Sequence, residues 1–460
     1  MRPLIVINVV GLTPRLLGPS TPHLSALVQK MGIRSLAPAF PAVTCTAQSS
    51  MLTGLPPSQH GIVGNGWYFR DLGEVFLWRQ SNRLVAGEKV WEAAKRRDPA
   101  FTCANLFWWY AMHTTADISV TPRPIYLADG RKLPDCYATP AGLAEELTAR
   151  LGTFPLFRFW GPTTTIESSR WIANAALHVR RTHKPSLTLV YLPHLDYDLQ
   201  RLGPTHPKIA QAVGEVDALC GELIADAARD GADVLAVSEY GITPVSRPVH
   251  INRALRAAGL LAVRDERGRE QLDPVVSTAF AVADHQVAHV YVREPARVAE
   301  VAALLRAEPG IETVLDADGQ KAVGLAHERS GELVAVAAAD SWFTWYHWLD
   351  DRRAPDFART VEIHRKPGYD PVELFFDPAL RFPQLSAAWR LAKRALGFRA
   401  LMDLIPLDAS LVKGSHGRKP DDPADAPVLI GADPALLPAG GGPVAMTAVK
   451  EIVLHHLFRA

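Results

Sequence analysis

Short apolar runs rich in β-branched residues alternate along the chain with longer amphipathic segments, and this alternation constrains the fold more than any other feature. Strands buried on both faces that alternate with helices predict a mostly parallel central sheet with helices on both faces, so the predicted fold class is α/β. Thr21 stands where it could cap the first helix. The expected strands are 4–9, 101–107, 186–192 and 233–237, and the expected helices are 22–31, 166–181 and 208–228.

The middle of the chain has a different character. Two strands are expected at 279–283 and 287–292, paired around Asp284 and His285, and an aromatic and acidic stretch follows at 340–357. A chain of 460 residues is longer than one core usually fills, since cores stop growing near about 250–300 residues. We therefore expect a core made of 1–254 and 396–460, and an inserted cap region at 255–395 that is partly continuous with it.

Bulk properties narrow the partners and the compartment. The net charge of +1 comes with no clustered basic stretch, so no nucleic-acid partner is expected. The apolar run from Leu4 to Val10 is too short to span a bilayer, and it favours a buried strand over a signal peptide, so no membrane partner is expected. The spacing of the four cysteines fits no zinc ribbon or redox pair, and a cytoplasmic location is the expectation. A homo-oligomer is left open.

The most specific motif lies at 40–65 and reads FPAVTCTAQSSMLTGLPPSQHGIVGN. Thr44 is expected at the start of a helix there, where unpaired backbone N–H groups and the helix dipole favour a phosphate group. The alternative is that Thr44 only caps the helix. Three further motifs follow in order, YLPHLDYDLQRLGP at 191–204, SEYGITPV at 238–245 and GSHG at 414–417.

This ordered set resembles the type I phosphodiesterase/nucleotide pyrophosphatase branch of the alkaline phosphatase superfamily. The resemblance implies that Thr44 is the nucleophile of a two-step displacement, and that Asn65 helps to hold a phosphoryl oxygen. The backbone N–H of Cys45 is a second donor candidate. Asn65 could equally be a turn residue between glycines.

The resemblance also implies two adjacent divalent metals, usually zinc, but the ligand positions depart from the pattern. They fall on Val10, Thr44, Asp196, Gln200, Glu239, Tyr240 and His416. A valine cannot bind a metal, and glutamine and tyrosine are weak replacements for histidine, which argues against a two-zinc centre. We expect one divalent ion (Zn, Mn, Mg or Ca) held by Asp196, Glu239 and His416.

Other residues could substitute for the missing ligands. Asn8, Asp198 and His250 are near the motifs in sequence, and Gln200 and Tyr240 stand at the ligand positions themselves. Each has an ordinary alternative, since Asp198 and Gln200 could be solvated and His250 could pack beside the helix that begins near residue 251. More distant candidates are Asp284, His285 and His364.

The expected function is a metal-dependent hydrolase of phosphodiester or phosphoanhydride bonds that acts on a small phosphorylated substrate with a threonine nucleophile. One alternative is a phosphoryl transferase or sugar-phosphate hydrolase on the same fold. Another is a non-catalytic binding protein that has lost its metals. A metal site requires Asp196, Glu239 and His416 to converge within about 4 Å of one point, and it is excluded if Gln200 and Tyr240 fill that space.

Overall fold

The protein is described by a computed structural model that covers residues 1–128, 131–438 and 440–459. These residues form a nine-stranded central sheet in the order β23-β2-β22-β11-β1-β10-β5-β6-β9. The five strands from β11 to β6 are parallel to one another, which confirms the predicted α/β class. Their bounds are β11 Asp233–Val237, β1 Leu4–Val9, β10 Leu187–Leu192, β5 Cys103–Leu106 and β6 Ile118–Pro122.

β6 was not predicted, nor were the four remaining strands of this sheet, which run mostly antiparallel. β22 pairs antiparallel with β11 and β2, and β9 pairs antiparallel with β6, whereas β2 and β23 are parallel. These strands are short, so their sequence carries little periodicity. Their bounds are β2 Ile33–Ala37, β9 Cys136–Thr139, β22 Val428–Ile430 and β23 Val444–Ala445.

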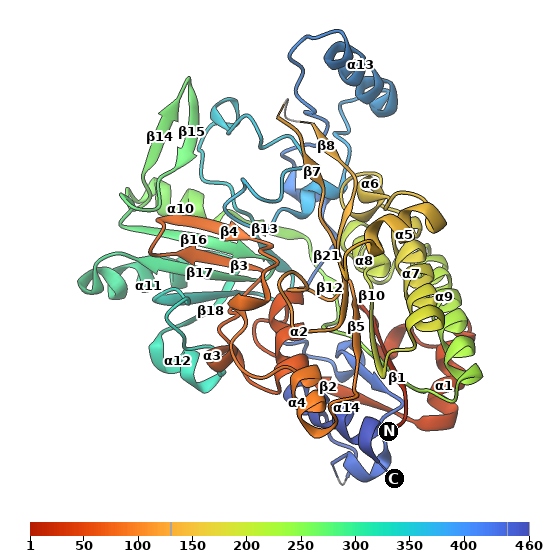
Figure 1. Cartoon of the computed structure of the whole chain (residues 1–460). Helices are drawn as coiled ribbons and strands as arrows, with labels where there is room; N and C mark the ends of the chain where they lie inside the picture. The colour runs from red at the N-terminus through yellow and green to blue at the C-terminus, as the bar shows by residue number, and fades with distance from the viewer. Residues whose placement is uncertain (129–130, 439, 460) are drawn as a thin grey trace.

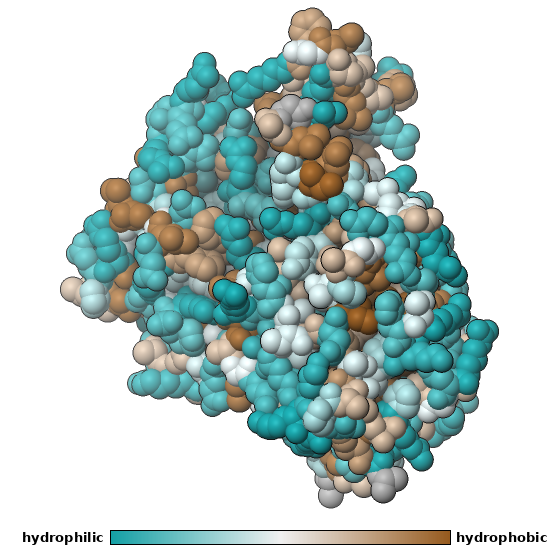
Figure 2. Space-filling view, in the orientation of Figure 1, coloured by the Kyte–Doolittle hydropathy of each residue, from teal (hydrophilic) through white to brown (hydrophobic). Residues whose placement is uncertain are grey.

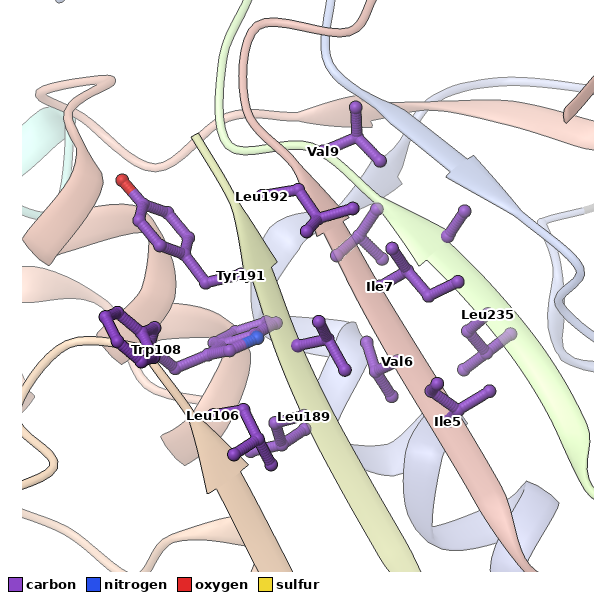
Figure 3. Packing of buried hydrophobic residues seen from close by; sticks show 14 of the residues in the cluster. Ile5, Val6, Ile7, Val9, Leu106, Trp108, Leu189, Tyr191, Leu192 and Leu235 are labelled. Atoms are coloured by element: carbon purple, nitrogen blue, oxygen red, sulfur yellow. The ribbon is translucent and has the colours of Figure 1, made fainter. Parts of the chain in front are cut away.

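The centre of the sheet is dry and closely packed. Figure 3 shows the apolar side chains of β5, β10, β1 and β11 lying side by side, among them Leu106, Leu189, Val6 and Leu235. These side chains are buried, because parallel strands are covered on both faces. The sheet therefore provides a rigid platform whose carboxyl ends hold the polar motifs.

Helices cover both faces of the sheet. In Figure 1 α1, α7 and α9 lie on one side, and α2, α4 and α14 on the other. The first helix is not capped by Thr21 as predicted. Its free N–H groups at His23 and Leu24 donate instead to the buried carboxylate of Asp217 on α9, at 3.0 and 2.8 Å. The bounds are α1 Pro22–Met31, α2 Thr44–Thr53, α4 Val90–Arg97, α7 Glu167–His183, α9 Ile209–Arg229 and α14 Val449–Phe458.

A second, four-stranded sheet lies beside the central one, in the order β16-β17-β19-β18. The predicted pairing around Asp284 and His285 is confirmed, since β16 and β17 form an antiparallel hairpin there. Tyr68 and Leu77, from the hairpin β3–β4 near the N-terminus, pack into its apolar core. The domain boundaries at 255 and 395 stay a prediction. The bounds are β16 Ala279–Asp284, β17 Val287–Val292, β18 Ile311–Leu315, β19 Leu333–Ala337, α10 Ile251–Ala257, α11 Val298–Ala307, β3 Gly66–Phe69 and β4 Glu74–Leu77.

Shorter elements connect the two sheets and decorate them. The aromatic stretch after residue 340 is a buried cluster that contains Trp342, Trp345 and Trp348, so it packs a core instead of presenting rings to solvent. Three two-stranded pairs are β12–β21, β13–β20 and β14–β15. Their bounds are β12 Thr243–Pro244, β21 Gly414–Ser415, β13 Arg247–Val249, β20 Ser341–Phe343, β14 Val263–Glu266 and β15 Arg269–Leu272, and the other short helices are α3 Pro57–His60, α5 Leu143–Leu151, α6 Leu156–Phe159, α8 His194–Leu202 and α12 Ala317–Ala322.

One helix stands apart from the body. α13 (Pro383–Ala395) buries none of its residues, and in Figure 1 it projects from the top of the molecule. None of the helices in residues 1–128, 131–438 and 440–459 has the length and apolar composition that crossing a bilayer requires.

Candidate active site

The polar motifs meet at the carboxyl ends of the central parallel strands, as the predicted fold requires. Asn8 lies at the end of β1, Asp196 follows β10 in the first turn of α8, and Glu239 follows β11. Thr44 is the first residue of α2, and its side chain faces this edge of the sheet. Strand topology therefore brings together residues that are up to 231 positions apart.

The Thr44 hydroxyl begins a directed chain of hydrogen bonds. Its Oγ1 lies 3.1 Å from the Tyr240 hydroxyl, which donates to Asp196 Oδ1 at 3.2 Å. Either hydroxyl could donate in the Thr44–Tyr240 contact; with the proton of Tyr240 directed to Asp196, Thr44 is the donor to Tyr240. Gln200 donates its side-chain amide to the other oxygen of Asp196, at 2.7 Å. The chain thus runs from Thr44 through Tyr240 to a carboxylate.

Glu239 is held by two side-chain amides. Asn8 Nδ2 and Gln48 Nε2 both donate to Glu239 Oε1, at 2.6 and 2.5 Å, and Glu239 Oε2 has no hydrogen-bond partner. Gln48 was missed by the sequence analysis. It lies four residues after Thr44 in the same helix, and that spacing places both side chains on one face, so the signal was present.

Asn65 connects the start of α2 to the second sheet. Its side-chain oxygen accepts from the backbone N–H of Cys45 at 3.0 Å. Its backbone N–H and side-chain amide donate to Asp284 at 2.8 and 3.0 Å. The expected phosphoryl donors, Asn65 and the Cys45 N–H, therefore lie together beside Thr44 and are bonded to each other.

A column of four stacked rings closes the site. Tyr240 stacks on His416 with ring centroids 3.5 Å apart, His416 packs on His285 at 3.6 Å, and His285 stacks on Tyr369 at 3.8 Å. The hydroxyl of Tyr369 donates to Gln200 Oε1 at 3.1 Å, and this contact links the ring column to the hydrogen bonds around Asp196. Tyr369 was also missed, because its loop carries only turn residues and no pattern that points to this site.

Burial sets the protonation of these groups. It raises the pKa of Asp196 to about 7 and that of Glu239 to about 8, against the hydrogen bonds from the amides, which act in the opposite direction. Burial likewise raises the pKa of Asp284 to about 6 and lowers that of His416 to about 3. Burial favours the neutral form of the three carboxyls, and their donors, which are amides, a backbone N–H and a phenol, carry no positive charge that would offset it fully.

The expected metal ligands do not form a metal centre in this arrangement. His416 Nε2 lies 3.9 Å from Asp196 Oδ1, but each oxygen of Asp196 already accepts a hydrogen bond, one from Tyr240 and the other from Gln200. The described parts of the chain contain no group of three His, Cys, Asp or Glu side chains that could hold a metal ion. Val10, at one implied ligand position, is packed in the apolar core.

The other predicted ligands fall in different places. Asp198 pairs with Arg201 at the surface of α8, and His250 packs beside α10 with Nδ1 2.8 Å from Thr344 Oγ1, so the structure brings neither to Thr44. His364 is exposed. Asp284 and His285, the distant candidates, do reach the site, through Asn65 and His416. His285 is thus held in the ring column.

The sequence matches the family described as Type I phosphodiesterase/nucleotide pyrophosphatase over residues 4–370. A pyrophosphatase/phosphodiesterase of Schizosaccharomyces pombe, itself described as uncharacterised, is 25% identical over 240 residues, which are 49% of this chain and 41% of that protein. Ectonucleotide pyrophosphatase/phosphodiesterase family member 3 of Bos taurus is 23% identical over 193 residues, or 41% of this chain and 18% of that protein. The matches thus span less than half of these relatives.

Solved structures share the fold across nearly the whole chain. Phosphonoacetate hydrolase from Sinorhizobium meliloti 1021, in complex with phosphonoformate, aligns with a TM-score of 0.63 and 15% identity, covering 99% of this chain and 96% of that chain. Human ectonucleotide pyrophosphatase/phosphodiesterase 5 aligns with a TM-score of 0.58 and 15% identity, covering 99% and 95%. At this identity the likeness establishes the fold.

Proposed function

Because the chain belongs to the type I phosphodiesterase/nucleotide pyrophosphatase family, within the alkaline phosphatase superfamily, we propose that it hydrolyses phosphodiester or phosphoanhydride bonds of a small phosphorylated substrate with Thr44 as the nucleophile. The observation that carries the proposal is the hydrogen-bond chain from Thr44 through Tyr240 to Asp196. It supplies a route for the hydroxyl proton, which a threonine must lose in order to attack phosphorus.

The proposed reaction has two steps. Thr44 Oγ1 forms a bond to phosphorus as the bond to the leaving oxygen breaks, the Thr44 proton passes to Tyr240, and the Tyr240 proton passes to Asp196. In the second step water attacks the phosphothreonine, the bond between phosphorus and Thr44 breaks, and Asp196 returns its proton through Tyr240. The proton that water loses passes to solvent, and the anionic leaving group of the first step takes up one proton from solvent, so the hydrolysis balances. The helix dipole of α2 favours the phosphoryl charge next to Thr44.

Enzymes of this family typically depend on divalent metal ions. The residues here do not fit such a centre, because three side-chain amides and a phenol make the contacts that metal ions would make with Asp196 and Glu239. The proposed chemistry therefore uses only the side chains of the protein. The expected single divalent ion is tested by dialysis against EDTA, after which turnover should stay within about twofold of the untreated protein.

The nucleophile is tested by turnover of a chromogenic phosphodiester and of a dinucleotide pyrophosphate. Thr44→Ala removes the attacking oxygen, so hydrolysis should fall to the uncatalysed background, whereas Thr44→Ser keeps a hydroxyl and should retain measurable activity. Thr46→Ala is the matched control, since Thr46 is a buried threonine in the same turn whose hydroxyl donates to the carbonyl of Ile62. Equal rates for wild type and Thr44→Ala would refute the proposal.

A second candidate is a protein that binds a phosphorylated ligand without turnover. The burial of the site favours it, since Thr44 is only 3% exposed and its neighbours bond to one another. Isothermal titration with AMP separates the two candidates. Binding by wild type together with turnover indistinguishable from that of Thr44→Ala would support the binding protein.

A further inference from the structure

The helix α13 presents a continuous apolar stripe to solvent. Phe382, Leu385, Trp389 and Leu396 are spaced by three, four and seven residues, which places them on one helical face. Leu385, Trp389 and Leu396 are 67%, 60% and 71% exposed, and the stripe lies in the brown region at the top of Figure 2. An isolated helix of this length is marginal in water, so it needs a surface that covers this face.

The charge on the same segment is of one sign. Between residues 378 and 402 there are no acidic residues, and the basic ones are Arg381, Arg390, Lys393, Arg394 and Arg399. With the flanking Asp377 and Asp403 included, five positive charges stand against two negative ones. Arg390 pairs with Asp403 at 2.7 Å, and Arg394 donates to the backbone carbonyl of Ala400 at 2.7 Å.

Two basic side chains lie close to the aromatic rings of the stripe. Lys393 Nζ lies 5.2 Å from the ring centre of Trp389, and the Arg381 guanidinium lies 5.5 Å from the ring centre of Phe382. Helices that lie in a membrane interface combine an apolar face rich in Trp, Phe and Leu with a polar face rich in Lys and Arg. Long basic side chains can reach outward from such a face to lipid phosphates.

We propose that α13 is a peripheral membrane-binding helix that inserts its apolar stripe into the interface of a bilayer containing anionic lipids. The exposed apolar stripe and the excess of basic residues both favour an anionic bilayer as the partner. A second copy of the chain would bring two positively charged segments together, which disfavours a homodimer through this face. The proposal departs from the expectation, based on the lack of a spanning segment, that the protein has no membrane partner, and it is independent of the chemistry at Thr44.

The test is flotation of the full chain with vesicles of phosphatidylcholine alone or with 30% phosphatidylglycerol, a composition chosen as about a third anionic lipid. Wild type should float with the anionic vesicles, and raising the salt concentration should weaken the binding because the charges are exposed. The double variant Leu385→Ser/Trp389→Ser should bind the vesicles at least about tenfold more weakly than wild type, since it removes two apolar side chains from the inserted face. Replacing Lys393 or Arg394 by Glu should weaken binding to the anionic vesicles about fivefold for each residue changed.

Leu72→Ser is the matched control, because Leu72 is a similarly exposed leucine in the β3–β4 hairpin and should leave binding unchanged. α13 buries no residue, so its variants should keep the circular dichroism spectrum and the turnover of wild type. No preference for anionic vesicles, or equal binding by wild type and the Leu385→Ser/Trp389→Ser variant, would overturn the proposal. If light scattering shows dimers of wild type that the Leu385→Ser/Trp389→Ser variant dissociates into monomers, the proposal would also be overturned, in favour of a second copy of the chain.

Discussion

The hydroxyl of Tyr240 provides the sharpest test of the proton route. Tyr240→Phe removes one oxygen atom and leaves the ring in place, stacked 3.5 Å from His416. The change breaks two contacts at once, since Thr44 loses its acceptor and Asp196 loses one of its donors. Proton transfer by a positioned group contributes about 10²–10⁴-fold to a rate, so kcat/KM should fall by at least about 10²-fold, or about 2.7 kcal/mol in transition-state free energy.

The assay is turnover of a chromogenic phosphodiester from pH 5 to pH 9, with unfolding followed by circular dichroism. Wild-type turnover should rise with pH through about 7, because Asp196 accepts a proton only when ionised and burial raises its pKa to about 7. The variant should lose most of this activity at every pH. The lost hydrogen bonds should cost about 1–3 kcal/mol of folding free energy, which leaves the protein folded.

Tyr369→Phe is the matched control. This tyrosine also stacks on a histidine of the column and also donates one hydrogen bond, but to Gln200, which is one step further from Thr44. Its loss should reduce turnover only a few-fold. If Tyr240→Phe retains kcat/KM within twofold of wild type, or if both variants lose activity equally, the relay through Tyr240 is refuted.

Three further predictions concern the metal, pH and helix capping. Gln200→His adds an imidazole beside Asp196 and His416, so equilibrium dialysis followed by elemental analysis should find about one zinc per chain in the variant and substoichiometric zinc in wild type. Burial lowers the pKa of several histidines away from the site to about 3–4. Below about pH 6.5 these histidines take up protons in the unfolded chain but not in the folded chain. They therefore lower the free energy of unfolding as pH falls from 6.5 to 4. A replacement of His289 by Gln should therefore narrow the difference in melting temperature between pH 7 and pH 5, and an equal difference would contradict this. The residues are His60, His289 and His347. Asp217→Ala should lower the free energy of unfolding by about 1–2 kcal/mol in urea denaturation, because the N–H groups at the start of α1 lose their acceptor, whereas Asp217→Asn should recover part of it.

The central strands and helices could be predicted because each is specified by its own local pattern. β1 and α1 have the bounds that hydrophobic periodicity predicts, and α9 differs by one residue at each end. The cap of α1 could not be predicted, since Asp217 reaches it from 194 residues away. The antiparallel strands β22 and β9 were missed for another reason, because three or four residues carry no usable period.

The motif residues lie at the carboxyl edge of the sheet, where the fold predicted them, whereas the described residues contain no three-ligand group of the kind expected for a metal. Thr44, Asp196, Glu239 and His416 are each next to strands or helices that the topology brings to one edge of the sheet. The prediction that three of them form a metal centre depended on their remaining free. The amides of Gln48 and Gln200 bond to the carboxylates instead, and hydrogen-bond partners of this kind are not specified by a residue's position in a motif.

The column of stacked rings has a kinetic consequence. Its members come from four parts of the chain, with Tyr240 after β11, His285 in the β16–β17 turn, Tyr369 in a later loop and His416 after β21. Because Thr44 is only 3% exposed, a substrate reaches it only when the segments around it move, and we expect the parting of this column to limit the encounter. The association rate constant should then lie below the range of about 10⁵–10⁷ per molar per second that is common for unobstructed sites, and it should depend weakly on the charge of the ligand.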